Sequence, residues 1–166
     1  KDQIWKKAFT LPAGSYGYKA AIDKSWTENY GAKGERDGAN IGYETTDGSV
    51  TFYYDHATHW VTSDKEGPIL TIPGDFQSEL NCPADWAPSC MRPWLQDKDG
   101  DGTYTWSTKL IPAGTWSFKV AQGLSWDISY GEGGGSSNMT VTVPAAGATT
   151  TFVYDSATHR TTVTSQ

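Results

Sequence analysis

The chain repeats itself at an offset of 100 residues, and this repeat constrains the fold more than any other feature. Residues 10–31, TLPAGSYGYKAAIDKSWTENYG, align without a gap with residues 110–131, LIPAGTWSFKVAQGLSWDISYG. In the same register, TFYYDHATH at 51–59 matches TFVYDSATH at 151–159. Two ungapped blocks at one offset indicate that a structural unit has been duplicated within the chain.

The two copies differ in length, because nothing in the first copy corresponds to residues 68–100. We therefore expect two domains, an incomplete one at 1–64 and a complete one at 68–166, joined by a short polar linker. A β-structure that lacks strands leaves an open edge, which invites pairing with another chain. The missing strands are expected to belong to a longer polypeptide or to another chain.

Apolar side chains recur with the period of a strand and never with that of a helix. In the second copy, Trp116, Phe118 and Val120 alternate with Ser117 and Lys119, which points the large side chains inward and the lysine outward. Short runs of this kind, separated by Pro, Gly, Asp and Ser, predict an all-β fold. We expect two immunoglobulin-like antiparallel β-sandwich modules, the first incomplete at its N-terminal side. The strands predicted for the complete copy are 69–74, 91–95, 103–111, 115–121, 125–128, 139–143, 150–154 and 159–164.

Composition excludes several classes of partner. With 13 basic against 19 acidic residues, the net charge of -6 argues against nucleic-acid binding, which needs a basic surface. No apolar run approaches the roughly 20 residues of a membrane span. Aromatic residues reach 13%, and the cores of small β-modules account for most of them. Aromatic rings left exposed would suit the flat C–H faces of sugar rings.

Cys82 and Cys90 flank a Pro-rich loop, CPADWAPSC. A disulfide across this loop is the favoured interpretation, and it implies an oxidising, secreted or cell-surface location. Two free thiols or a metal-binding pair are the alternatives. The bridge would stiffen the loop that carries Trp86, which is either an exposed binding residue or a cap on one end of the core.

A lysine and a tryptophan recur together in both copies, as Lys19 with Trp26 and Lys119 with Trp126. We expect an adjacent antiparallel strand to bring each pair to one edge. An indole offers an apolar platform and an ammonium offers three hydrogen-bond donors, which together suit a sugar. The alternative is a core tryptophan beside a solvated lysine. The lysine is kept in both copies while Tyr16 changes to Trp116, which favours binding.

The strings GDFQSEL, CPADW, DGDGTYTW, LIPAGTWSFKVA, SWDISYG and TFVYDSATH resemble the accessory modules found in tandem in bacterial pullulanases. More distantly, they are similar to the starch-binding modules of amylases and glucoamylases. The resemblance covers nearly all of 68–166 and the later two-thirds of a module in 1–64. It implies a secreted, non-catalytic module that binds starch, maltooligosaccharides or pullulan and directs a covalently attached amylolytic enzyme to them.

The resemblance also implies which residues bind the sugar. Starch-binding modules use a G-D-W tryptophan, a strand lysine and a second tryptophan on the next strand. The matching residues of the second copy are Trp86, Lys119 and Trp126. Those of the first copy are Lys19 and Trp26, without a counterpart of Trp86. An asparagine that follows the second tryptophan is matched by Asn29, whereas the second copy has Ser129; Asn40 and Asn138 are alternatives.

Neither a metal nor a catalytic centre is expected. Asp97, Asp99 and Asp101 alternate as in the start of an EF-hand loop, but position twelve is Thr108, so a hairpin turn is favoured over this weak calcium candidate. A glycosidase needs two carboxylates across a cleft, and none of the acidic residues recurs in a setting that suggests such a pair. We expect no cofactor and no enzymatic activity; the alternatives to sugar binding are a structural spacer and a protein-interaction module.

Overall fold

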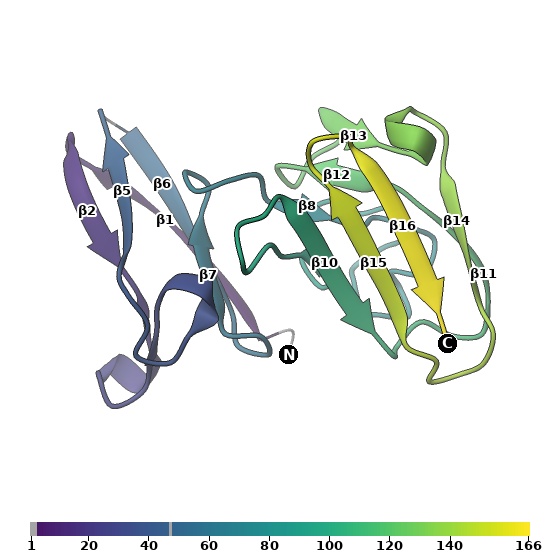
Figure 1. Cartoon of the computed structure of the whole chain (residues 1–166), viewed down its shortest axis with the longest axis horizontal. Coiled ribbons are helices and arrows are strands. Elements are labelled where there is room, and N and C mark those ends of the chain that lie inside the picture. The colour runs from purple at the N-terminus through teal and green to yellow at the C-terminus, as the bar shows by residue number, and fades with distance from the viewer. Residues whose placement is uncertain (1–2, 47) are drawn as a thin grey trace. The chain divides into compact units, whose positions relative to one another are not determined.

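The computed structural model describes residues 3–46 and 48–166, and the chain forms two compact units, Lys1–Pro68 and Ile69–Gln166 (Figure 1). The described residues contain no α-helix, only the single-turn 3₁₀ segments η1 (Ile22–Lys24), η2 (Ala32–Gly34) and η3 (Glu132–Gly134). The predicted all-β class is therefore confirmed. Within the described ranges, no helix has the length and apolar character needed to cross a bilayer.

The described residues of the first unit form seven strands, and all of their pairings are antiparallel. They form the sheets β1-β6-β7, β2-β5 and β3-β4. Their bounds are β1 (Ile4–Leu11), β2 (Gly14–Tyr18), β3 (Ala20–Ala21), β4 (Asn29–Tyr30), β5 (Ile41–Thr45), β6 (Gly48–Asp55) and β7 (Trp60–Ser63).

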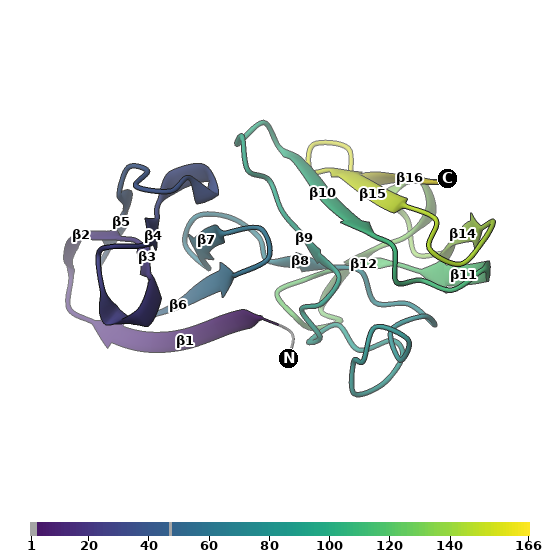
Figure 2. The same ribbon diagram turned by 90° about the horizontal axis from the view of Figure 1, so that it is seen from below.

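The second unit contains the sheets β10-β15-β16, β11-β14 and β13-β12-β8-β9, again antiparallel throughout (Figures 1 and 2). Its strands are β8 (Leu70–Thr71), β9 (Trp94–Leu95), β10 (Thr103–Thr108), β11 (Gly114–Phe118), β12 (Val120–Gln122), β13 (Ile128–Tyr130), β14 (Met139–Val143), β15 (Thr150–Asp155) and β16 (Arg160–Ser165). Strands β10 to β16 repeat the pairing of β1 to β7. Strands β8 and β9 have no counterpart in the described part of the first unit.

Two of the predicted strands are much shorter than expected, and a third is displaced. The segments 69–74 and 91–95 contribute only β8 and β9, because the chain between them turns repeatedly around the disulfide loop. The segment 125–128 is a turn up to Asp127, and β13 begins at Ile128. The prediction that Trp126 lies on a strand is therefore wrong, and the same holds for Trp26, which lies in a turn before β4.

The core of the second unit is built around aromatic rings. Phe118 packs edge-on against Phe152, with ring centroids 5.0 Å apart and an interplanar angle of 86°, an arrangement that aromatic quadrupoles favour. Trp106 stacks on Phe152 at 5.4 Å, and Phe76 lies 6.1 Å from it. Six side chains from the segment before β10 are buried in this core: Leu70, Ile72, Phe76, Leu80, Cys82 and Leu95.

The equivalent face of the first unit is open. Phe152 and Tyr154 are buried, whereas their repeats Phe52 and Tyr54 are only half-buried. Trp5, which lies opposite Tyr54 in the β1–β6 ladder, is 56% exposed. In the second unit residues 69–96 cover these rings, whereas the described residues of the first unit contain no equivalent segment.

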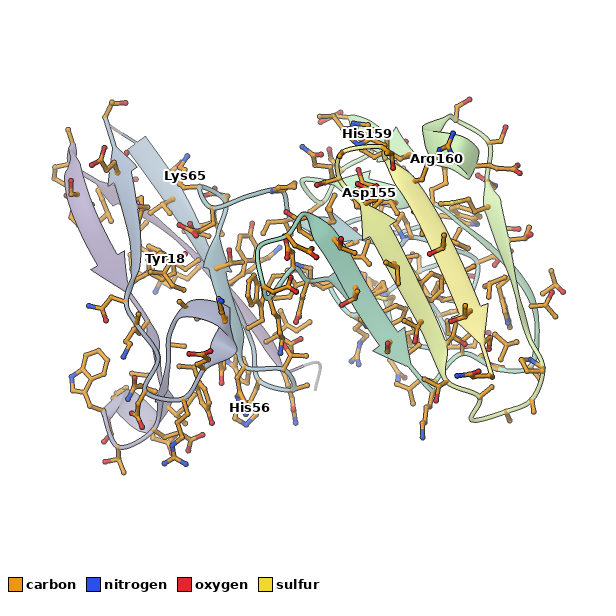
Figure 3. The ribbon with its side chains drawn as sticks, in the orientation of Figure 1. Tyr18, His56, Lys65, Asp155, His159 and Arg160 are labelled. Carbon is orange, nitrogen blue, oxygen red and sulfur yellow. A yellow bond between two sulfur atoms is a disulfide. The ribbon has the colours of Figure 1, made fainter. Side chains whose placement is uncertain are left out.

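The D-x-A-T-H motif, which both copies share, builds the turn that follows β6 and β15. In the second unit Asp155 and His159 lie at the two ends of this turn (Figure 3). The Asp155 carboxylate accepts hydrogen bonds from the Ala157 and Thr158 amides and from the Thr158 hydroxyl. These bonds, the hydroxyl's above all, lower the pKa of Asp155. His59 and His159 end the two turns with φ of 59° and 58°. The repeat of this motif is therefore explained by turn geometry, as its side chains satisfy backbone donors locally.

Each of these histidines also stacks on a tyrosine. The rings of Tyr30 and His59 lie 3.8 Å apart and nearly parallel, and those of Tyr130 and His159 lie 4.1 Å apart. His59 Nδ1 lies 3.0 Å from the Tyr54 hydroxyl, and His159 Nδ1 lies 2.8 Å from that of Tyr154. Burial raises the pKa of Tyr54 to about 12, so the phenol remains a neutral hydrogen-bonding group at physiological pH.

The unequal burial of Phe152 and Phe52 predicts unequal costs for the same substitution. We expect Phe152→Ala to destabilise the second unit by about 3–5 kcal/mol, the usual cost of emptying a buried aromatic site. We expect Phe52→Ala to cost the first unit less, because its ring is already partly in water. Hydrogen exchange of the β15 and β6 amides under increasing denaturant measures each loss within its own unit. Equal losses would contradict the open face described above.

Candidate functional site

Trp126 is held in solvent by the turn that carries it. Ser125 Oγ accepts a hydrogen bond from the Asp127 amide at 3.2 Å and donates one to the Asp127 carboxylate at 2.9 Å. A serine that binds the backbone two residues on favours a turn over a strand. The indole between them is 43% exposed. Trp26 occupies the same kind of turn, with Ser25 Oγ accepting from the Thr27 amide at 3.2 Å, and is 72% exposed.

Trp86 reaches the site from the loop that the disulfide closes. Cys82 and Cys90 are bonded, with their Cα atoms 5.9 Å apart. The Trp86 amide donates to the Gly74 carbonyl at 3.0 Å, and the residue has a φ of 55°. Such a conformation is uncommon for a bulky side chain and costs about 1–3 kcal/mol. The surrounding contacts therefore impose the orientation of this half-buried indole.

Gln77 is the main source of that constraint. Its side chain is fully buried. Gln77 Oε1 accepts from the Ala87 amide at 2.7 Å and Nε2 donates to the Ala87 carbonyl at 3.0 Å, so both backbone groups of the residue after Trp86 are satisfied. Asp85, which precedes Trp86, accepts from the Ser78 amide at 2.7 Å. Residues 85–87 are thus held from both sides by residues 77–78.

These two segments bring Trp86 and Trp126 together. The ring centroids of the two indoles lie 6.4 Å apart, and their planes are inclined by 37°. The residues are 40 positions apart in the sequence, and only folding places them side by side. Together the two indoles form a tilted aromatic platform, in which Trp126 is the more exposed of the two residues.

Lys119 lies beside the same backbone support. Its amide donates to the Pro73 carbonyl at 2.9 Å, and the neighbouring Phe118 forms a β-bridge with Gly74, whose carbonyl binds Trp86. A Cβ on Gly74 would approach the Ser117 carbonyl oxygen to 2.7 Å and the Phe76 ring to 2.8 Å. This glycine therefore lets the Trp86 loop and the Lys119 segment share one stretch of backbone. Lys119 is half-buried.

In the first unit, Lys19 and Asn29 are joined by a hydrogen bond. Lys19 Nζ donates to Asn29 Oδ1 at 2.9 Å. Asn29 Nδ2 donates to the Trp26 carbonyl at 3.1 Å and to the Asp37 carboxylate at 2.6 Å. Since Asn29 is only 5% exposed, it acts as a support that ties the lysine to the Trp26 turn. The alternatives Asn40 and Asn138 are exposed in the Gly-rich loops.

The acidic triplet forms a tight turn. The Asp97 carboxylate accepts from the amides of Gly100, Asp101 and Gly102, at 2.8, 3.2 and 2.9 Å. One carboxylate oxygen each of Asp97, Asp99 and Asp101 lies within 4.8 Å of the others. The turn therefore accounts for Asp97 and Asp101, whose carboxylates accept backbone amides within it.

Comparison with known proteins identifies the family. The family model described as the pullulanase X25 domain matches twice, at residues 1–61 and 69–161. The chain belongs to this family. Among curated relatives, it is 34% identical to the amylopullulanase of Thermoanaerobacter thermohydrosulfuricus and 36% identical to that of Thermoanaerobacterium saccharolyticum. Each match covers 157 residues, which are 90% of this X25 chain but only 10% and 12% of those enzymes.

A solved structure agrees with this assignment. The pullulanase from Bacillus acidopullulyticus matches 58% of this chain, with 31% identity and a TM-score of 0.51, over 11% of its own length. The X25 region is therefore a small part of large amylolytic enzymes, which confirms the resemblance to pullulanase accessory modules.

Gln77 and Ser125 are residues that sequence reasoning missed. Each of them hydrogen-bonds the backbone of the residue that follows a tryptophan. The sequence does not indicate this role, except that a serine precedes both Trp26 and Trp126. Asn29, in contrast, was expected to contact sugar, and the structure places it among protein groups.

Gln77→Leu should loosen the Trp86 loop without unfolding the unit. The substitution leaves the Ala87 N–H and C=O without their partner, at a cost of about 1–3 kcal/mol for each unsatisfied group. We expect faster hydrogen exchange at residues 85–88 and a lower melting temperature. Ser89→Ala, at an exposed position of the same loop, is the matched control and should change neither. An unchanged exchange rate in Gln77→Leu would show that Gln77 does not hold the loop.

Proposed function

We propose that the second unit binds an α-glucan chain on Trp86 and Trp126, with Lys119 as a hydrogen-bond donor to sugar hydroxyls. The observation that carries this proposal is the pairing of the two indoles at 6.4 Å on the surface. An exposed pair of large aromatic rings is costly in water unless a ligand covers it. Sugar rings suit such a pair, because their C–H faces are apolar while their rims carry hydroxyls.

The inclination of the indoles favours a curved chain. Consecutive glucose rings of an α-1,4-linked chain turn along their length, so they present faces that are inclined to each other. Two platforms inclined by 37° fit that geometry better than they fit a flat, ribbon-like glucan. The disulfide and the buried Gln77 fix one platform before the ligand arrives, which reduces the entropy lost on binding.

We propose a second, weaker site on the first unit, formed by Trp26 with Lys19. Here one indole stands alone at 72% exposure, and Asn29 holds the lysine in place. A single platform buries less of the sugar than two. Because both sites belong to one chain, a polysaccharide that reaches both would bind more tightly than either site alone allows.

The module would thereby keep an attached amylolytic enzyme near starch or pullulan. The names of the relatives, amylopullulanase and pullulanase, support an α-glucan substrate. In this role the chain is a non-catalytic part of a secreted enzyme, and its units are immunoglobulin-like β-sandwiches that carry binding residues on turns.

Trp126→Ala should weaken binding to soluble maltooligosaccharides by about 30-fold, since removing a central aromatic contact costs about 2 kcal/mol or more. Isothermal titration calorimetry measures the affinity, and retention on insoluble starch gives a second readout. Leu110→Ala is the control, because Leu110 is also exposed, at 66%, but lies outside the platform. Trp26→Ala should reduce retention on starch more than affinity for short oligosaccharides.

Full retention on starch by both Trp126→Ala and Trp86→Ala would contradict the site. Absence of binding by the unaltered chain to starch, maltooligosaccharides and pullulan would leave a structural spacer or a protein-interaction module as the function.

A further inference from the structure

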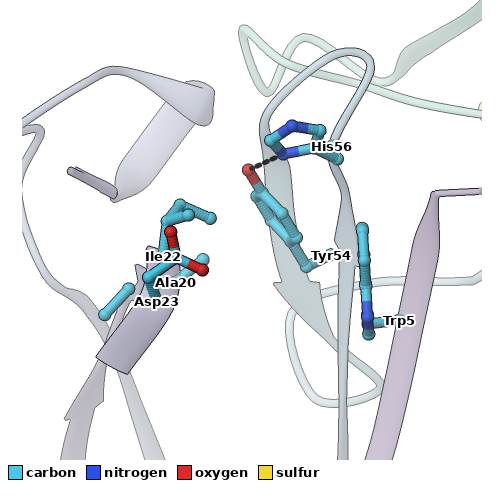
Figure 4. Close-up of a pocket in the computed structure, with 7 residues that line it drawn as sticks. Trp5, Ala20, Ile22, Asp23, Tyr54 and His56 are labelled. Atoms are coloured by element: carbon cyan, nitrogen blue, oxygen red, sulfur yellow. Dashed lines mark hydrogen bonds between the residues drawn. The ribbon is translucent and has the colours of Figure 1, made fainter. Parts of the chain in front are cut away.

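Two histidines of the first unit direct the same ring nitrogen toward one hydroxyl group. His56 Nδ1 lies 3.2 Å and His59 Nδ1 lies 3.0 Å from the Tyr54 hydroxyl oxygen, and Figure 4 shows the first of these contacts as a dashed line. The two imidazole rings stand edge to face, with centroids 5.4 Å apart and planes inclined by 85°. Three atoms that can bind a metal ion, two nitrogens and one oxygen, therefore converge on one place.

The repeat shows that the turn does not require both histidines. In the second unit the Tyr154 hydroxyl bonds His159 Nδ1 at 2.8 Å. Ser156 takes the position of His56 there, and the D-x-A-T-H turn forms all the same. Because a phenol has one proton, it can donate to only one of two imidazole nitrogens. His56 thus adds a nitrogen that neither the turn nor the phenol proton needs.

The spacing of these atoms matches the ligands of a tetrahedral metal ion. Zn²⁺ binds imidazole nitrogen at about 2.0–2.1 Å, so two neighbouring ligand atoms of a tetrahedral site lie about 3.3 Å apart. The nitrogen–oxygen distances of 3.2 and 3.0 Å differ little from that value. Imidazole is also a ligand that zinc, copper and nickel ions prefer. One such ion can therefore reach all three atoms with small movements of the side chains.

The surroundings hold one ligand in place and suit a positive charge. The His59 ring stacks on Tyr30 at 3.8 Å with an interplanar angle of 3°, and the residue ends its turn at a φ of 59°. The Tyr30 hydroxyl donates to the Glu28 carboxylate at 2.8 Å, and Asp55 precedes His56 in the chain. Two carboxylates therefore belong to the residues next to the histidines, and opposite charges nearby favour a bound cation.

We propose that His56 Nδ1, His59 Nδ1 and the Tyr54 hydroxyl oxygen form a binding site for Zn²⁺, with water as the fourth ligand. Three protein ligands and one water make up an accessible zinc site. The bound ion ties the turn after β6 to the strand itself. None of these three residues belongs to the proposed glucan sites, so zinc binding and starch binding can succeed or fail independently.

Calorimetric titration of the metal-free whole chain with Zn²⁺ tests the site. We expect one ion per chain and a higher melting temperature with excess Zn²⁺, because the ion binds the folded turn. Mg²⁺ should not compete, since it prefers oxygen ligands. His56→Ser should weaken Zn²⁺ binding by about 100-fold or more, because loss of a residue that merely supports a metal ligand already costs about 10–100-fold. The second unit forms this turn with Ser156, so the variant should keep its fold.

A matched pair of substitutions locates the ion. His59 and His159 end equivalent turns with φ of 59° and 58°, a conformation that asparagine tolerates. His59→Asn should abolish Zn²⁺ binding, whereas His159→Asn should leave it unchanged. Absence of Zn²⁺ binding by the unaltered chain, full binding by His56→Ser, or equal losses in His59→Asn and His159→Asn would each overturn the proposal. Displacement of Zn²⁺ by an equal concentration of Mg²⁺ would also overturn it, because the ion would then occupy an oxygen site such as the acidic turn 97–101.

Discussion

The burial of Phe118 and Phe152 beneath the segment 69–96 is the contact on which the rest of the second unit depends. Leu70, Ile72 and Phe76 complete the apolar core around these rings. The same segment continues into Gln77 and the disulfide loop, which hold Trp86 in an orientation that the residue does not favour by itself. Core stability therefore supplies the energy that keeps the first indole of the proposed platform in place.

Comparison of the two units distinguishes the local from the long-range contributions to the fold. The D-x-A-T-H turn, the Tyr–His stack and the serine-supported tryptophan turn form in both units, although among the described residues the covering segment 69–96 belongs to the second unit alone. These features rest on contacts among residues that the duplicated sequence blocks contain. Burial of the β6 and β15 aromatic rings differs between the units, because it requires residues that only the second copy has.

Much of the architecture could be predicted from the sequence for the same reason. The repeat and the strand-period alternation indicated the all-β class and most of the strands of the second unit, because these depend on short-range pattern. The tryptophan turns were mistaken for strands, since Trp126 precedes Ile128 and Tyr130 in what looks like a continuing alternation. The hydrogen bonds of the Ser125 hydroxyl stabilise a turn instead of a strand. Any serine can form such side-chain bonds in competition with the backbone bonds of a sheet, so the sequence alone does not show which serines do.

The positions that support the site were beyond prediction for a different reason. Gln77 accepts a hydrogen bond from the backbone amide of Ala87, and Gly74 lies close against Ser117 and Phe118. Both contacts arise only when separate segments meet in the folded chain. The pairing of Trp86 with Trp126 is likewise a product of the fold, although both residues were candidates from their sequence context.

The exchange of Asn29 for Ser129 separates the two lysines chemically. In the first unit the Asn29 side chain accepts a hydrogen bond from the Lys19 ammonium and links it to the Trp26 turn. A serine hydroxyl is shorter and cannot donate and accept with the geometry of an amide. Lys119 is half-buried, and its amide donates to the Pro73 carbonyl. A lysine held by the protein must give up a bond or share it to meet a ligand. The duplicated units therefore differ at their proposed sites: in the first, Asn29 links the lysine to the turn of one indole, whereas the second has a serine at that position and pairs two indoles.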